Sequence, residues 1–251
     1  MIKELLSNKI FKNFSVLTAT SIIIQFISIL SSIRLARLLH ADGYGYFNFI
    51  LVLSNIFLII SSYGLKQVII RYVARNKTES RFVFNLSNQI RLVTTLISVL
   101  CLLGYNTLLN DKPLPPFVLI LLSVIIICQS VWEAVECIAF GNEKMEPSGY
   151  INLAFTSIWV IAVYLVPKNR FNPEFLLVIY VLIQCFKSLT YFFWLKKDVF
   201  DVRKQHDENP SLNHGFLIKQ SNYYFILAVF TALQTQVPIL LLNHNSTYDQ
   251  V

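Results

Sequence analysis

The sequence predicts an all-α protein, a polytopic transmembrane helix bundle with about seven spans. Of its 251 residues, 55% are hydrophobic and 14% are charged, whereas soluble globular proteins carry about 25% charged residues. Between Phe14 and Phe49, two long apolar runs are joined by a short basic segment that contains Gly43 and Gly45, a pattern that predicts a helical hairpin. Water cannot accommodate so much apolar helix surface, so we expect this hairpin to lie in a bilayer.

Seven apolar stretches have about the 20 residues that a helix needs to cross a bilayer. They cover roughly residues 14–34, 45–64, 90–109, 117–140, 150–166, 175–195 and 216–242. Seven of the eight prolines fall between these stretches, where no helix needs the N–H that proline lacks. The loops on the side opposite the N-terminus are very short, so a multi-pass membrane protein without an extracytoplasmic domain is predicted.

The basic residues are unevenly divided between the two sides of the predicted bundle. If the N-terminus is cytoplasmic, the cytoplasmic segments hold 15 Lys and Arg residues and the opposite side holds 5. Cytoplasmic loops of membrane proteins carry such an excess, so we expect a cytoplasmic N-terminus. The same loops explain the surplus of 21 Lys and Arg over 14 Asp and Glu as contacts with anionic lipid, and no nucleic-acid partner is expected.

Polar residues inside five of the spans recur at steps of three, four or seven, which places each set on one helix face. The sets are Thr18, Ser21, Gln25, Ser28 and Ser32; Asn48, Asn55 and Ser62; Arg91, Thr94, Thr95, Ser98 and Tyr105; Gln129, Glu133 and Glu136; and Tyr180, Gln184, Lys187, Tyr191 and Trp194. One interpretation is close helix packing through small polar residues. The other is a shared polar lumen, typical of a transporter, a channel or an enzyme with a lipid substrate, and five sets in one chain favour it.

Lys187 is the most deeply placed charge, about 18 Å along its predicted helix. A lysine at this depth is costly unless it is paired or hydrated, although its side chain can also extend toward the interface. Glu133 is a candidate partner, and Glu133 and Glu136 are alternatively candidates for binding a coupling H⁺ or Na⁺. No Ser-His-Asp set, metal cluster or phosphate-binding loop is visible. We therefore expect no enzyme activity and no metal or cofactor beyond a coupling ion.

Two stretches resemble the polysaccharide and O-antigen flippase family of the multidrug/oligosaccharidyl-lipid/polysaccharide exporter superfamily. Residues 35–45 hold a Leu-Ala-Arg-x-Leu pattern followed by a glycine-aromatic turn. Gly64 and Leu65 end the second span, and Arg71 and Arg75 follow it. The resemblance extends over nearly the whole chain.

The resemblance implies two lobes of helices that face a central cavity. Residues 1–210 would form the N-terminal six-helix lobe, and residues 211–251 would hold the first helix of a truncated C-terminal lobe. The end of the chain, TQVPILLLNHNSTYDQV, aligns loosely with the first hairpin and places His244 at the position of His40. By this resemblance, the protein would flip a lipid-linked oligosaccharide across the bacterial inner membrane by alternating access, beside polysaccharide-assembly membrane proteins.

The same resemblance assigns roles to the polar residues of the spans. Lys187 would bind the anionic head group or sugar acids, the three glutamines would hydrogen-bond sugar hydroxyls, and Glu133 would pair with Lys187 or couple an ion. The predicted substrate-binding residues are Lys187, Gln25, Gln129, Gln184, Glu133, Glu136 and Arg37. Two alternatives stay open: a drug or cation antiporter of the same superfamily, and a membrane-bound polysaccharide polymerase or acyltransferase.

Overall fold

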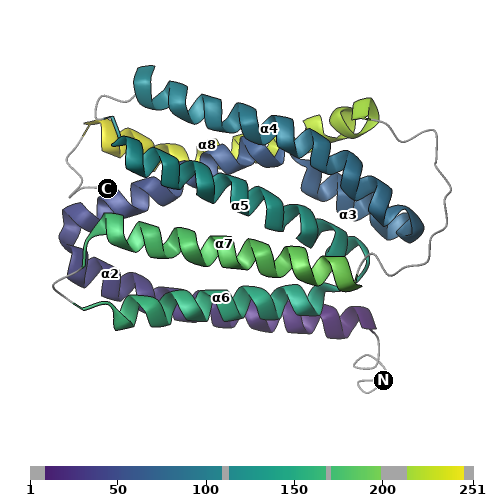
Figure 1. The fold of residues 1–251 in the computed structure, drawn as a ribbon, viewed down its shortest axis with the longest axis horizontal. Helices are drawn as coiled ribbons and strands as arrows, with labels where there is room; N and C mark the ends of the chain where they lie inside the picture. Colours follow the sequence, from purple (N-terminus) through teal and green to yellow (C-terminus); the bar gives the residue numbers. More distant parts are fainter. Residues whose placement is uncertain (1–8, 109–112, 168–170, 199–213, 246–251) are drawn as a thin grey trace.

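The computed structural model describes residues 9–108, 113–167, 171–198 and 214–245, and these residues form a bundle of helices without strands (Figure 1). The elements are α2 (Lys9–Ser62), α3 (Leu65–Arg75), the 3₁₀ turn η1 (Lys77–Glu79), α4 (Ser80–Leu108), α5 (Pro116–Gly141), α6 (Met145–Leu165), α7 (Pro173–Asp198) and α8 (His214–Asn245). The predicted all-α class is therefore confirmed. The predicted boundary between the two lobes, at residues 210 and 211, lies outside the described residues. Part of the C-terminal stretch that was aligned with the first hairpin does so too. Both stay predictions.

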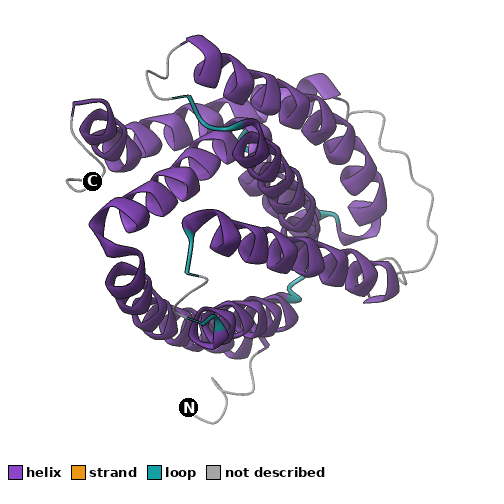
Figure 2. Cartoon of the chain, turned by 60° about the vertical axis from the view of Figure 1, so that its left-hand side comes forward, coloured by secondary structure: helices purple, strands orange, loops and turns teal. Residues whose placement is uncertain are grey.

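The predicted hairpin is formed by the two limbs of α2. The helix is interrupted at His40, whose φ of 57° and ψ of −180° are not helical, and the chain reverses direction there (Figures 1 and 2). The apolar part of α2, Ser15–Ser62, has 48 residues and is about 72 Å long, more than twice the thickness of a bilayer core. Gly43 and Gly45 were expected to mark the turn, but both lie within helix.

Six of the described helices are long and apolar enough to cross a membrane. Because α2 reverses at His40, these six account for the seven predicted spans. Most observed bounds lie within a few residues of the prediction, but α4 begins at Ser80, ten residues before the predicted start at 90. Pro116 and Pro173 occupy the first positions of α5 and α7, where their fixed φ favours helix initiation.

The helix α3 was not predicted, because residues 65–89 were interpreted as a basic loop. One face of α3 is buried through Leu65, Val68, Ile69 and Val73. This spacing of three and four is the pattern of an amphipathic helix, so the signal was present in the sequence. The helix follows the second limb of α2 directly and leads through η1 into α4.

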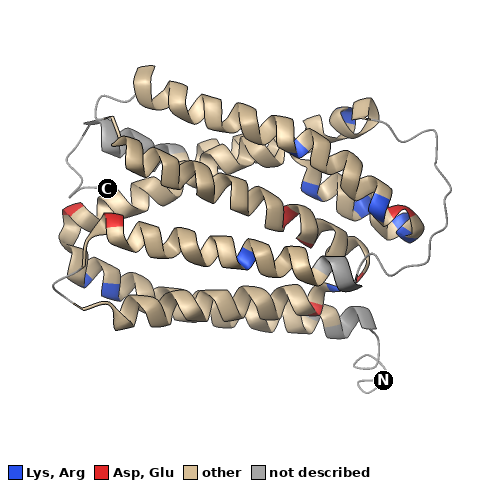
Figure 3. Cartoon of the chain, viewed as in Figure 1, with Lys and Arg blue, Asp and Glu red and all other residues tan. Residues whose placement is uncertain are grey.

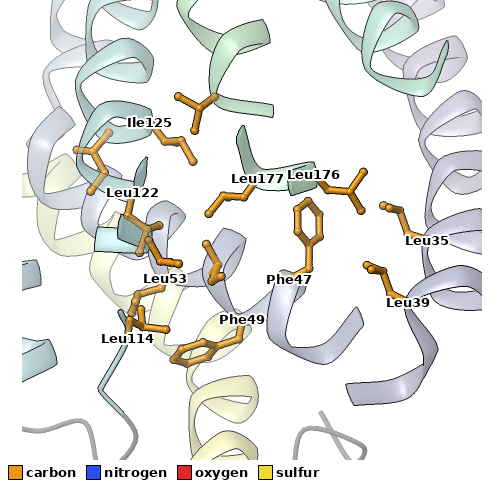
Figure 4. Close-up of a cluster of buried hydrophobic side chains, with 14 of the residues drawn as sticks. Leu35, Leu39, Phe47, Phe49, Leu53, Leu114, Leu122, Ile125, Leu176 and Leu177 are labelled. Atoms are coloured by element: carbon orange, nitrogen blue, oxygen red, sulfur yellow. The ribbon is translucent and has the colours of Figure 1, made fainter. Parts of the chain in front are cut away.

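Apolar side chains form two clusters in the bundle. The first gathers residues from both limbs of α2, from α5 and from α7, including Leu35, Phe47, Leu122 and Leu177 (Figure 4). The second joins α3, α4 and α5 with Tyr191 of α7 and Leu217 of α8. Burial of such side chains against one another fixes the relative positions of the helices.

Two glycines allow close helix contacts. A side chain at Gly149 of α6 would place its Cβ 2.9 Å from Oγ1 of Thr20, on the first limb of α2. Gly64, between α2 and α3, has a φ of +66°, and a Cβ there would lie 2.6 Å from the backbone nitrogen of Phe225 in α8. Only glycine combines that backbone conformation with such proximity, so Gly64 positions α8 against the end of α2.

Candidate functional site

A cavity of about 370 Å³ lies between the two limbs of α2 and the helices α5, α6 and α7. Its volume falls within the range of about 300–1,000 Å³ that is usual for ligand pockets. It is lined by Ser28, Ser31, Ser32, Leu35, Tyr44, Phe47, Asn48, Leu51, Gln129, Trp132, Phe155, Thr156, Trp159, Tyr180, Ile183, Gln184 and Lys187. The lining is therefore rich in hydroxyl, amide and aromatic groups.

Two predicted substrate-binding glutamines, Gln129 of α5 and Gln184 of α7, line this cavity. Both residues are mostly buried, at 7% and 8% exposure. The side-chain oxygen of each has no hydrogen-bond partner among the described residues. Because buried polar atoms are costly without a partner, these two oxygens would gain from a hydrogen bond to water or to the polar groups of a ligand in the cavity.

Aromatic rings form a second part of the cavity lining. Phe47 and Trp159 are stacked with their ring centroids 6.1 Å apart, and Tyr180 meets Trp159 edge-on at 5.3 Å. Trp132 contributes a further indole from α5. Ring faces beside amides and hydroxyls suit a ligand that is apolar on one face and polar at its edges.

Lys187 is the one charged residue among those that line the cavity. Its Nζ lies 3.8 Å from the ring centroid of Trp132, a cation–π contact between α7 and α5. No ion-pair partner of Lys187 is found among the described residues. The aromatic contact holds the ammonium group at the cavity wall and leaves its charge available to an anionic ligand.

Glu133 does not pair with Lys187, its candidate partner from the sequence. Its Oε2 accepts a hydrogen bond from Nη1 of Arg91 at 3.0 Å, and Arg91 is 1% exposed. The prediction failed because α4 begins at Ser80, which carries Arg91 about 16 Å into the bundle and beside α5. Arg91 was predicted at the very start of its span, where it would meet the membrane surface, whereas the structure places it in a buried ion pair.

The polar set of α4 packs against α2 and α5 and does not line the cavity. Thr94 donates a hydrogen bond to the carbonyl of Ser61 at 2.7 Å, and Ser98 donates to the carbonyl of Phe57 at 2.5 Å. These contacts join α4 to the second limb of α2. For this span, the packing interpretation of the polar face is correct.

Glu136 is the centre of a buried hydrogen-bond network at the end of the bundle that carries α3. It forms an ion pair with Nζ of Lys66 at 3.1 Å and accepts hydrogen bonds from Ser148 at 2.7 Å, Asn152 at 3.2 Å and Tyr191 at 3.4 Å. The network therefore ties α5 to α3, α6 and α7. Burial lowers the pKa of Lys66, but attraction to the Glu136 and Glu133 carboxylates, together with the hydrogen bond to Glu136, exceeds this effect, and the net result is a pKa above the ordinary value.

The remaining predicted residues lie away from the cavity. Gln25 and Arg37 are exposed on the first limb of α2 and are not part of the cavity lining. Arg34, near the end of the same limb, donates hydrogen bonds to the carbonyls of Val163 and Tyr164 at 3.1 and 3.0 Å. These contacts satisfy carbonyls at the last turn of α6.

The contribution of α6 to the cavity was missed. No polar face was identified in residues 150–166, yet Thr156 and Trp159 line the cavity and Asn152 contacts Glu136. The three residues recur at steps of four and three, so the same periodicity that identified the other faces could have found this one. Within the described part of the chain, no group of three His, Cys, Asp or Glu residues is placed to hold a metal ion.

Comparison with known proteins agrees with this architecture. The sequence model of a family described as "Polysaccharide biosynthesis protein" matches residues 10–244, which is most of the chain. No curated protein and no solved structure matches the chain. The family match confirms the resemblance that the two sequence stretches indicated. The chain is a multi-pass membrane protein and belongs to the polysaccharide biosynthesis protein family.

Proposed function

We propose that the protein translocates a lipid-linked oligosaccharide across the bacterial inner membrane for surface polysaccharide biosynthesis, by alternating access and without chemical change to the substrate. The observation that carries this proposal is the cavity between α2, α5, α6 and α7. Its lining combines one cation, two unpartnered amide oxygens, several hydroxyls and a group of aromatic rings. Membership in the polysaccharide biosynthesis protein family supports the choice of a sugar-bearing substrate.

Each part of the lining matches a part of such a substrate. Gln129 and Gln184 offer oxygens that accept hydrogen bonds from sugar hydroxyls, and Trp159 offers an apolar face to a sugar ring. Lys187 offers positive charge to a pyrophosphate or to acidic sugars. The cavity lining holds no carboxylate that could take up a coupling H⁺.

The same observation weighs against a drug or cation antiporter. A site for cations needs accessible negative charge, and the two span carboxylates considered for it already pair with cations: Glu133 with Arg91 and Glu136 with Lys66. The cavity itself presents Lys187, which would repel a cationic ligand. No specific observation favours a polymerase or an acyltransferase.

Substrate binding to the purified chain in lipid nanodiscs tests the proposal. The three tryptophans are Trp132, Trp159 and Trp194, and the first two line the cavity. Their fluorescence is therefore expected to change saturably when polyprenyl-pyrophosphate-linked oligosaccharide is added. Tetraphenylphosphonium, a lipophilic cation, is expected to cause no saturable change. The opposite pattern, a response to the cation alone, would favour the antiporter.

A pair of glutamine variants shows whether the fluorescence change reports the cavity. Gln184→Leu removes an amide of the lining whose oxygen has no partner among the described residues, and it is expected to weaken binding about three- to tenfold, the effect of one lost hydrogen bond. Gln67→Leu, on the exposed surface of α3 and outside the lining, is the matched control and is expected to bind normally. Equal binding by both variants would place the substrate elsewhere.

We infer further that the N-terminus is cytoplasmic. Lys and Arg residues gather at the end of the bundle that carries α3 (Figure 3), the end at which α2 begins. Such an excess is characteristic of the cytoplasmic side. An alkaline phosphatase domain fused after Val251 is therefore expected to be active, because that enzyme folds only outside the cytoplasm. An inactive phosphatase fusion together with an active β-galactosidase fusion at the same position would reverse the orientation.

A further inference from the structure

A second cavity, separate from the first, lies between α3 and the beginning of α8. It has a volume of about 200 Å³. Its lining, which we call the α3–α8 groove, consists of Val68, Arg71, Tyr72, Arg75, Phe216, Gln220 and Tyr224. Neither the proposed function nor the family match assigns a role to it.

The two arginines of the groove are its most distinctive feature. Arg71 and Arg75 are four residues apart on α3 and therefore share one helix face. Both are exposed, and neither has a hydrogen-bond or ion-pair partner among the described residues. Two guanidinium groups at this spacing, without a carboxylate in the lining, suit an anion with several oxygen atoms, and phosphate matches their planar donor geometry.

The location of the groove indicates where that phosphate comes from. The helix α3 begins directly after the end of α2, and the apolar part of α8 begins at His214. The groove therefore lies at the ends of membrane-spanning helices, at the level where lipid head groups are found. Tyr72 and Tyr224 are of the residue type that is enriched at this level.

The surface of α8 next to the groove is apolar. Phe216, Leu227 and Phe230 have exposed fractions of 42%, 64% and 66%. Phe216 lines the groove, and Leu227 follows Gln220 by seven residues and precedes Phe230 by three, so these side chains lie on or beside the face of α8 that carries Gln220 and Tyr224. A ligand whose head group lies between the arginines could therefore extend hydrocarbon chains along α8.

We propose that the α3–α8 groove binds an anionic glycerophospholipid. Arg71 and Arg75 bind its phosphate, Gln220 and Tyr224 hydrogen-bond the head group, and the acyl chains lie along α8. Basic pockets between helices at the cytoplasmic side of a membrane bind anionic lipids in this way. The proposal does not depend on the substrate of the first cavity, because the two sets of lining residues do not overlap.

Native mass spectrometry of the full chain in detergent tests this proposal. Phosphatidylglycerol is titrated in one arm, phosphatidylcholine in a second and glycerol 3-phosphate in a third. We expect phosphatidylglycerol to bind at least tenfold more tightly than the other two. In the R71A/R75A double variant, its apparent affinity is expected to fall about tenfold or more, given the contribution of each basic residue near a lipid surface.

Further variants separate specific recognition from general attraction. R71K/R75K keeps the charge but loses the planar fork, and we expect it to retain part of the affinity. R81A removes a positive charge from α4 outside the groove and is expected to bind phosphatidylglycerol normally. The single variants R71A and R75A, each with an intermediate loss, support the same conclusion even if the double variant is poorly folded.

Three results would overturn the proposal. Equal losses in R81A and R71A/R75A would show attraction by surface charge in general. Equal affinity for phosphatidylcholine would show that the anion is not recognised. Binding of glycerol 3-phosphate as tightly as phosphatidylglycerol would make the ligand a soluble phosphate rather than a lipid.

Discussion

Lys187→Met is expected to reduce export of the lipid-linked oligosaccharide about ten- to a hundredfold while the amount of folded protein in the membrane stays nearly normal. Methionine keeps most of the side-chain length and removes the charge that faces the cavity. A hydrogen bond to a charged group contributes roughly 1.5–3 kcal/mol, which is the basis of the expected range. The loss in stability is expected to be small, because Lys187 contacts Trp132 but has no described ion-pair partner.

The effect is measured as the amount of surface polysaccharide per unit of this protein in the membrane. The cells used make their surface polysaccharide only when this protein is active. Lys187→Arg keeps the charge in a different shape and is expected to retain partial export. Lys77→Met, which removes an exposed lysine that pairs with Glu143, is the matched control and is expected to export normally. Normal export by Lys187→Met at normal protein levels would remove Lys187 from the proposed binding site.

The structure also changes what a second substitution should do. Had Glu133 been the partner of Lys187, Glu133→Gln would be expected to rescue Lys187→Met by removing an unpaired charge. Because Glu133 pairs with Arg91, the double variant Lys187→Met/Glu133→Gln is expected to be no better than Lys187→Met alone.

Most of the fold could be predicted from the sequence, because apolar runs of about 20 residues have one common structure in a bilayer. The turn within α2 was placed a few residues too late, since glycines usually mark turns, whereas here His40 takes the positive φ. The helix α3 was missed for a different reason. Its basic residues suggested a loop, although Val68, Ile69 and Val73 already had helical spacing.

The candidate site was less predictable, because periodicity shows which residues share a face but not what that face contacts. The faces of Gln129 and of Lys187 line one cavity, whereas the similar face of Thr94 and Ser98 packs against backbone carbonyls of α2. The partner of Glu133 depends on how α4 lies beside α5, and the sequence contains no direct signal of that contact. Distances between helices required the structure.

Arg91→Met is expected to cause the largest loss of stability among the substitutions considered. Arg91 is 1% exposed, and its ion pair with Glu133 has side-chain exposures of 2% and 13%. Removing one partner of a buried pair leaves an uncompensated charge and costs about 3–5 kcal/mol. For a chain of this size, that cost corresponds to a fall of roughly 10 °C in the melting temperature of the detergent-solubilised protein.

The double variant Arg91→Met/Glu133→Gln separates the charge from the packing of Arg91. It removes both members of the pair and leaves no unpaired charge, so we expect it to recover more than half of the melting temperature that Arg91→Met loses. Lys77→Met breaks an ion pair whose side chains are 46% and 37% exposed and is expected to change the melting temperature little. If the double variant melts as low as Arg91→Met, Arg91 stabilises the bundle mainly by packing between α4 and α5, where its Nη2 also lies 3.6 Å from Sγ of Cys137. Recovery would instead show that charge balance between α4 and α5 holds this part of the bundle together.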